Sequence, residues 1–161
     1  MIKSVFQGLF NAEVNKHYSM IMPVKQMLYD LSAWVHRAVF GEVETVTDNL
    51  TLTASDSGKT FLVGTDAKTI TLPPTQAGVK YTFVNIGADG NNIITISPNA
   101  SDAIYGTLTL ADSIVKAAAT DDKDLINTKA TAVKGDSVTL VGDGGVGWAI
   151  VASTGIWAKQ G

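Results

Sequence analysis

The feature that most constrains the fold is a repeated unit in residues 54–98, where a short run of β-branched or aromatic residues precedes a turn. Apolar residues largely alternate with Thr or Lys in the four runs KTFLV, KTITL, VKYTFV and NIITIS. Such alternation is typical of strands that face a core on one side and water or a second layer on the other. The turns contain Gly, Asp, Asn and Pro, and Asp89-Gly90 is a typical hairpin sequence. We therefore predict a β-meander here.

The same pattern of short β-branched runs and turn residues continues to the end of the chain. Of the twelve acidic residues after Glu42, eleven are Asp, which favours turns over helix faces because Asp bonds back to its own backbone. Residues 117–134 show little periodicity and are compatible with a loop, a short helix or an edge strand. We predict strands at 44–46, 50–54, 60–63, 69–72, 80–86, 93–97, 104–110, 113–118, 137–141, 148–152 and 155–158. The fold class is mainly β, a small sandwich, jelly-roll-like or barrel domain.

Residues 1–42 differ in composition from this β domain, which we place at 43–161. All four methionines and six of the twelve aromatic residues lie in this N-terminal arm. Pro23 suits the first turn of a helix, and apolar residues then recur at three- and four-residue spacings up to Phe40. This α-helix, 23–40, packs either on its own sheet or on a partner, and its Met and aromatic content favours a partner. The candidate capsid or partner interface is Met27, Leu28, Leu31, Trp34, Val35 and Phe40.

Composition excludes several classes of protein. The chain has no cysteine, so disulfides, thiolate catalysis and cysteine metal sites are excluded. A net charge of −3, with twelve scattered basic residues, argues against a nucleic-acid partner. The apolar run from Pro23 to Phe40 carries Lys25, Asp30 and Arg37, which are costly in a bilayer, so we expect no membrane partner. We expect the protein to be made in a cytoplasm.

Motifs for catalysis or nucleotide binding do not have the required context. Ser57-Gly58-Lys59-Thr60 ends like a phosphate-binding loop, but Thr53 stands where the first Gly is required and a strand follows. The run 142–147 matches G-x-G-x-x-G, but a second strand follows it, so a hairpin is expected. His17 and His36 are the only histidines, and the acidic run 121–124 lacks calcium-loop spacing. We expect no enzymatic activity, cofactor, metal or small-molecule substrate.

The β domain resembles a known family. The order SGKTFLVGTDAKTITLP, GVKYTFVNIGADGNNIITISP, Ile104-Tyr-Gly and GDSVTLVGDGGVGWAIVASTGIW is similar to a β domain of tailed-bacteriophage structural proteins. This domain recurs in head decoration (cement) proteins and in tail fibre or spike modules, and the similarity covers residues 53–158. It implies a homotrimer on the outer surface of the virion. We expect the arm to attach it to the major capsid protein of a phage head, after assembly in the host cytoplasm.

A second hypothesis belongs to another functional class. In a tail fibre or spike module, loops of the β domain bind a host surface glycan and the arm joins a tail. Exposed aromatic side chains at Tyr105 and Trp157, with Asp and Asn beside them, are the candidates for such a site. The shortness of the chain and the lack of a collagen-like or long heptad shaft favour the decoration protein.

Overall fold

The computed structural model describes residues 24, 25, 32, 41–109, 114–117 and 122–160. The chain divides into two units, 1–40 and 41–161, each described by itself. In the first unit Val24, Lys25 and Ser32 are helical, while the rest of the predicted helix 23–40 lies outside the described residues. Within the described part of the chain, no helix combines the length and hydropathy needed to span a membrane.

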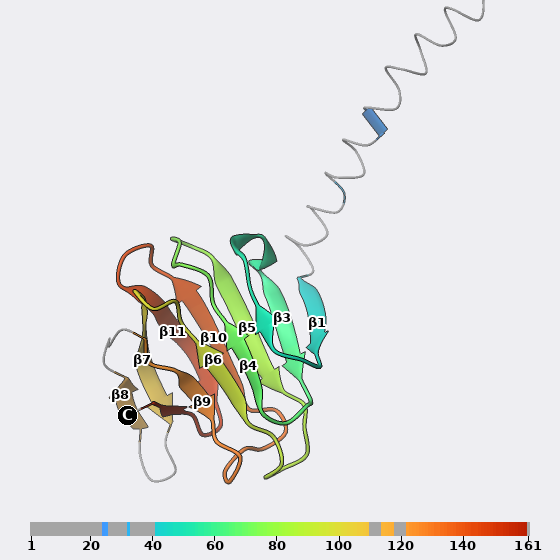
Figure 1. Ribbon diagram of the computed structural model, residues 1–161, viewed down its shortest axis with the longest axis vertical. Coiled ribbons are helices and arrows are strands. Elements are labelled where there is room, and N and C mark those ends of the chain that lie inside the picture. The colour runs from blue at the N-terminus through green and yellow to red at the C-terminus, as the bar shows by residue number, and fades with distance from the viewer. Residues whose placement is uncertain (1–23, 26–31, 33–40, 110–113, 118–121, 161) are drawn as a thin grey trace, which may run out of the picture. The chain divides into compact units, whose positions relative to one another are not determined.

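The second unit is a two-layer β-sandwich (Figure 1), which confirms the predicted fold class. The large sheet has the order β1 (Glu42–Val46), β3 (Lys59–Val63), β5 (Lys80–Asn85), β10 (Ser137–Gly142), β11 (Gly147–Thr154), β7 (Ala103–Thr109) and β8 (Ile114–Ala117). The small sheet has the order β12 (Ala158–Lys159), β9 (Leu125–Asn127), β6 (Ile94–Ser97), β4 (Lys68–Thr71) and β2 (Leu50–Thr51). A 3-10 helix, η1, spans Ala54–Asp56.

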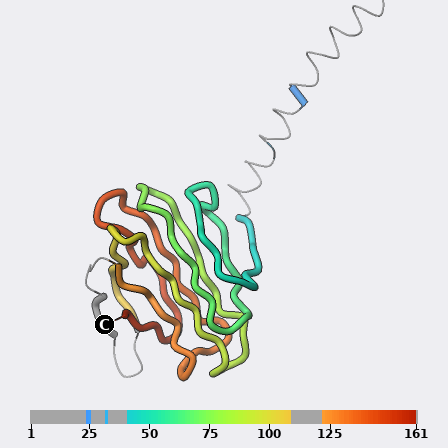
Figure 2. Tube along the Cα trace, in the orientation of Figure 1, coloured from blue at the N-terminus to red at the C-terminus, as the bar shows by residue number. Residues whose placement is uncertain are grey.

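The predicted β-meander is wrong. Strands β1 to β6 alternate between the two sheets, so that β1, β3 and β5 pair in parallel in one layer and β2, β4 and β6 in the other (Figure 2). Asp89-Gly90 therefore lies in a connection between sheets and not in a two-strand hairpin. The alternation of apolar residues specifies which side of a strand faces the core, but it is the same whether the next strand pairs beside it or crosses to the opposite layer.

The remaining strands are mostly antiparallel. β10 and β11 form the hairpin expected at 142–147, with a β-bulge between Thr139 and Leu140 that leaves Val151 without a partner in the register. β9, in the segment without periodicity, is a short strand between β6 and β12. β2 ends at Thr51 because Thr53 begins a capping box at the start of η1.

The core lies between the two sheets and is rich in aromatic side chains. Phe61, Tyr81 and Phe83 come from neighbouring strands of the large sheet, and all are fully buried. The rings of Phe61 and Phe83 stack with centroids 5.5 Å apart, and those of Tyr81 and Trp148 lie 5.2 Å apart. Each buried side chain of this kind contributes about 2 kcal/mol or more to folding. This rigid core holds the exterior of the large sheet in place.

Candidate functional site

The outer face of the large sheet is the candidate site. The strand register places three rows of side chains on it. The first row is Val43, Thr60, Thr82, Thr139 and Ala152. The second row is Thr45, Leu62, Val84, Ser137 and Thr154. The third row is Lys80, Val141, Ala149 and Tyr105. Together with Val151 at the bulge, these residues are called the outer face.

Exposed aliphatic side chains distinguish this face from that of the small sheet. Val43 is 64% exposed and Val151 is 58% exposed, although both are large hydrophobic residues. Lys80 is the one charged residue in the three rows. On the small sheet the outward positions Thr69, Thr95 and Ile126 include no exposed large hydrophobic residue. The outer face thus combines aliphatic and hydroxyl groups with very little charge.

Hydroxyl groups on the outer face are paired across strands. Thr82 and Thr139 share a hydrogen bond of 3.0 Å between their Oγ1 atoms. Ser137 and Thr154 share one of 2.9 Å between Oγ and Oγ1. Each pair uses one hydroxyl hydrogen and one lone pair, so the other hydroxyl of each pair keeps a donor for a molecule above the sheet.

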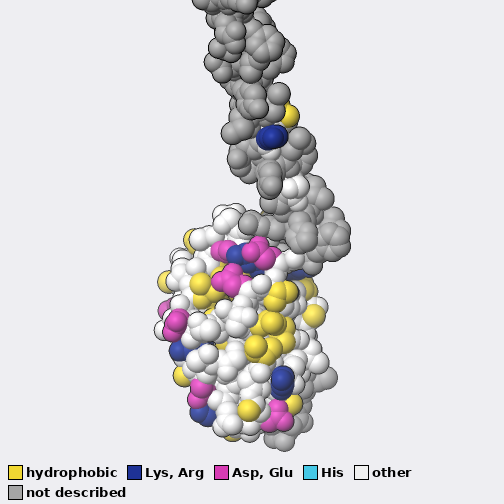
Figure 3. Space-filling model, turned by 90° about the vertical axis from the view of Figure 1, so that its right-hand side faces the viewer, with side chains coloured by type: hydrophobic (Ala, Val, Ile, Leu, Met, Phe, Trp, Pro, Cys, Tyr) yellow, Lys and Arg dark blue, Asp and Glu magenta, His cyan; other side chains and the backbone are white. Residues whose placement is uncertain are grey.

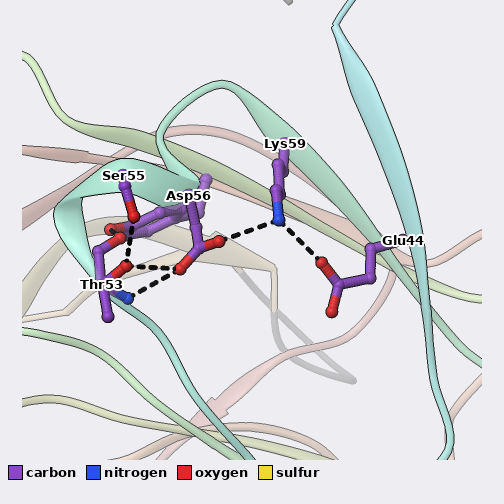
Figure 4. Close-up of polar contacts among 6 residues, drawn as sticks. Glu44, Thr53, Ser55, Asp56 and Lys59 are labelled. Atoms are coloured by element: carbon purple, nitrogen blue, oxygen red, sulfur yellow. Dashed lines mark hydrogen bonds and ion pairs between the residues drawn. The ribbon is translucent and has the colours of Figure 1, made fainter.

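An ion-pair cluster lies beside the edge strand β1, where η1 meets β1 and β3 (Figure 4). Lys59 Nζ lies 2.8 Å from Asp56 Oδ1 and 3.0 Å from Glu44 Oε2. Thr53 donates to Asp56 Oδ2 through its backbone N–H at 2.9 Å and its hydroxyl at 2.8 Å. The Tyr81 hydroxyl donates to the Thr53 carbonyl at 2.7 Å. The cluster fixes η1 against β1 and β3.

The electrostatics of this ion-pair cluster keep Lys59 charged. Hydrogen bonds to Asp56 and Glu44 raise the pKa of Lys59 above its ordinary value. Burial raises the pKa of Asp56, but hydrogen bonds from Lys59 and Thr53 outweigh burial and leave that pKa below its ordinary value. Burial, with a contribution from the Asp56 charge, raises the pKa of Tyr81 to about 12. A protonated lysine facing two carboxylates is neither a nucleophile nor free to bind a phosphate, which agrees with the rejection of the SGKT motif.

The β10–β11 loop is held by the Asp143 carboxylate and by Thr75, whose hydroxyl donates to the Gly147 carbonyl at 2.7 Å and accepts the Gly144 N–H at 3.3 Å. Asp143 Oδ1 accepts the backbone N–H of Gly145 at 2.7 Å and that of Gly147 at 2.9 Å. Asp143 Oδ2 accepts the Tyr105 hydroxyl at 2.6 Å. The hydrogen bond from Tyr105, followed by those from Gly147 and Gly145, lowers the pKa of Asp143. The loop is therefore a hairpin turn whose polar groups are hydrogen-bonded within the domain.

Glycine is required in this loop by close packing against β7. Gly147 has a φ of +150°, and a Cβ there would lie 2.1 Å from the carbonyl oxygen of Ala103. No side chain fits at that distance. Of the glycines that suggested a dinucleotide-binding motif, Gly147 thus has a structural reason at the β7–β11 contact, while Gly142 and Gly144 pack closely against residues 75–77.

A buried network of amides ties the two sheets together at one end of the sandwich. Asn85 of β5 donates from Nδ2 to Asn127 Oδ1 of β9 at 2.8 Å. Asn127 Nδ2 donates to Asp136 Oδ2 at 2.9 Å and to the Ile156 carbonyl at 3.1 Å. Asn92 Nδ2 donates to Asn85 Oδ1 at 2.8 Å. Sequence analysis missed this network, although Asn85 and Asn127 occupy inward positions of alternating strands, which was the available signal.

The glycan hypothesis loses one of its two aromatic residues. Trp157 was expected to be exposed, but it is fully buried in the core and its Nε1 donates to the Thr154 carbonyl at 3.0 Å. The expectation is wrong because Trp157, directly before β12, packs among the buried hydrophobic residues of the core. Tyr105 is half-buried, and its hydroxyl is occupied by Asp143.

The six candidate interface residues of the arm, Met27, Leu28, Leu31, Trp34, Val35 and Phe40, lie outside the described residues. Among the residues that the structure describes, no group of three or more His, Asp or Glu side chains could hold a metal ion. No protein-family model matches the chain, and no curated protein matches it. A functional hypothesis therefore depends on the outer face, on the two hydrogen-bonded loops at η1 and between β10 and β11, called the braced loops, and on the sequence pattern.

Proposed function

We propose that this protein is a structural component of a tailed-bacteriophage virion, a decoration protein that binds the assembled head and stabilises the shell as a trimer. The observation that carries this proposal is the outer face, a six-strand surface with exposed Val43 and Val151 and a single charge at Lys80. The strands between these two valines carry the half-buried Leu62, Val84 and Val141. A continuous stretch of exposed and half-buried aliphatic side chains is typical of protein–protein contact. The resemblance of residues 53–158 to phage structural domains gives the class of assembly.

The polar groups of the β domain support a mechanical role. Lys59 joins η1 to β1, Asp143 closes the β10–β11 loop, and Asn127 joins the two sheets. Each of these side chains is engaged with other parts of the same domain. A body whose connections are braced in this way transmits force between its contacts without rearrangement.

Shell stabilisation follows from selective binding. A protein that binds the assembled shell but not its dissociated subunits stabilises the shell by mass action, by about 2.7 kcal/mol per site at 100 times the dissociation constant. The arm supplies the contact with the major capsid protein in this proposal. Its large rigid side chains, with Trp34 foremost, are of the kind that dominates interface energies.

The test uses purified protein and phage heads that lack it. We expect saturable co-sedimentation of the protein with heads and a higher melting temperature of the shell. Trp34→Asp should abolish attachment and leave the β domain folded. Ser32→Asp is the matched control, since it adds the same charge two residues away on the polar side of the predicted helix. Full occupancy of heads by Trp34→Asp would contradict the assignment of the arm.

A further inference from the structure

We propose that Asp89–Gly90 is a site of spontaneous covalent modification, at which Asp89 isomerises to an isoaspartyl residue through a cyclic succinimide. The pair lies in the connection between β5 and β6, where residues 88–91 are all exposed. The inference is independent of the proposed function, because it concerns the chemistry of this connection alone.

The reaction takes place in two steps, and its only co-reactant is water. In the first step the backbone nitrogen of Gly90 attacks Cγ of the Asp89 carboxyl. The new N–Cγ bond replaces a C–O bond, and that oxygen leaves as water with the carboxyl proton and the amide proton. In the second step water opens the ring at the main-chain carbonyl carbon. The original peptide bond breaks, the nitrogen regains its proton and stays bound to Cγ, and the α-carboxylate is set free, so the mass of the chain is unchanged.

The surroundings of Gly90 leave room for both steps. A side chain on the attacking residue would hinder its nitrogen, and glycine has none. Gly90 has a φ of +70°, and a Cβ built there would meet no atom nearer than the Lys129 carbonyl oxygen at 3.9 Å. The exposed connection also admits the water that opens the ring.

Two hydrogen bonds hold the pair in the folded protein, and both go to residues 132–134. Asp89 Oδ1 accepts the Lys134 N–H at 2.8 Å, and the Gly90 N–H donates to the Ala132 carbonyl at 2.8 Å. Residues 133–135 are exposed, and hydrogen bonds in exposed connections open more readily than those of buried strands. One local opening therefore frees the carboxyl and the nitrogen together.

The other Asp-Gly pair of the chain, Asp143–Gly144, is protected. Its carboxylate accepts the Tyr105 hydroxyl and two backbone N–H groups of its own loop. These bonds, that from Tyr105 foremost, lower the pKa of Asp143. An ionised carboxylate reacts more slowly than the neutral acid, because its oxygen cannot leave as water. A Cβ at Gly144 would also lie 3.0 Å from the Ala77 nitrogen, so this loop has less room for the ring.

Asp56 and Asp136, which each precede a serine, are also held more firmly than Asp89. On the side of the domain where β1 lies, Figure 3 shows acidic and basic side chains gathered above a band of hydrophobic ones. Asp56 belongs to the ion-pair cluster beside β1, where Lys59 and Thr53 bind its carboxylate. Asp136 is only 6% exposed, and its carboxylate is part of the buried amide network.

Isomerisation at Asp89 alters the main chain beside this amide network. The isoaspartyl linkage runs through Cβ and Cγ, so it adds one carbon to the backbone of the β5–β6 connection. Asn92, three residues later, is buried and donates to the Val63 carbonyl at 3.1 Å and to Asn85 Oδ1 at 2.8 Å. A longer connection displaces these groups, so we expect the isomerised protein to unfold at a lower urea concentration than the unmodified protein.

The test is incubation of the full folded chain at neutral pH, with samples taken over time. An isoaspartyl methyltransferase, which methylates the freed α-carboxylate, measures total isoaspartate, and tandem mass spectrometry of proteolytic fragments locates it. We expect most of the isoaspartate at residue 89. Asp89→Glu keeps the charge but would need a larger, more slowly formed ring, so most of the signal should be lost. Asp143→Glu is the matched control and should keep the signal, with circular dichroism to establish that each variant is folded.

Unfolding the wild-type chain in urea separates the effect of structure from that of sequence. Without their hydrogen bonds, Asp89–Gly90 and Asp143–Gly144 should react at similar rates. Isoaspartate that forms first at residue 143 in the folded protein would overturn the proposal. Its absence at residue 89 over a period in which the unfolded chain reacts would do so as well. An equally strong preference for residue 89 in urea would refute the structural protection of Asp143.

Discussion

Replacing Asn127 by Ala should strongly destabilise the β domain. The change removes three hydrogen bonds, of 2.8 Å from Asn85, 2.9 Å to Asp136 and 3.1 Å to the Ile156 carbonyl. Asn85 and Asp136 are both buried, so water does not replace the lost amide freely. An unsatisfied buried donor costs about 1–3 kcal/mol, and a lost bond to a carboxylate costs about 1.5–3 kcal/mol. The expected loss is therefore about 4 kcal/mol.

Urea denaturation at a fixed protein concentration measures this loss. For a domain of this size, about 4 kcal/mol lowers the urea midpoint by about 2 M with an unchanged slope. Asn91→Ala is the matched control, because Asn91 lies in the same region but is exposed, and its midpoint should move by less than about 0.5 M. A loss below about 1 kcal/mol for Asn127→Ala would refute the claim that the amide network holds the two sheets together.

Three further predictions concern the braced loops. Gly147→Ala should prevent stable folding, because its Cβ would lie 2.1 Å from a backbone carbonyl oxygen of β7, and the yield of soluble folded protein reports this. Tyr105→Phe should raise the pKa of Asp143 toward its ordinary value, since it removes the hydrogen bond that lowers that pKa most, and an NMR titration of the carboxyl measures the shift. The lowered pKa of Asp56 contributes stability above its unfolded value of 3.8 that is lost at lower pH. In Lys59→Met, the urea midpoint should consequently fall less between pH 5 and pH 3 than in wild type, and an equal fall would contradict the role of the ion pair.

Strand positions in this chain were largely predictable from local sequence. The alternation in KTFLV, KTITL and VKYTFV placed β3, β4 and β5 within one or two residues of their observed bounds. Period-2 patterning reports burial of one side of a strand, and all three strands bury one side against the same core. Many such short strands predicted a sandwich, jelly-roll-like or barrel domain, and the structure is a sandwich.

Strand pairing was not predictable in the same way. Parallel pairing of β1, β3 and β5 depends on where each connection carries the chain, and the Gly, Asp and Pro content of a turn does not distinguish a return from a crossing. Trp157 was assigned to the surface because a two-residue strand leaves too short a pattern to show its orientation. The residues of the outer face could not be predicted for a related reason. They come together only through the strand register, which pairs Val43 with Thr60 and continues along each row.

The most direct test of the central claim is binding to phage heads that lack this protein, followed by thermal melting of the shells. The account predicts saturable binding at fixed sites on the head and a raised melting temperature, both lost in Trp34→Asp and retained in Ser32→Asp. Absence of binding by the folded protein, or binding that leaves the melting temperature of the shell unchanged, would contradict it.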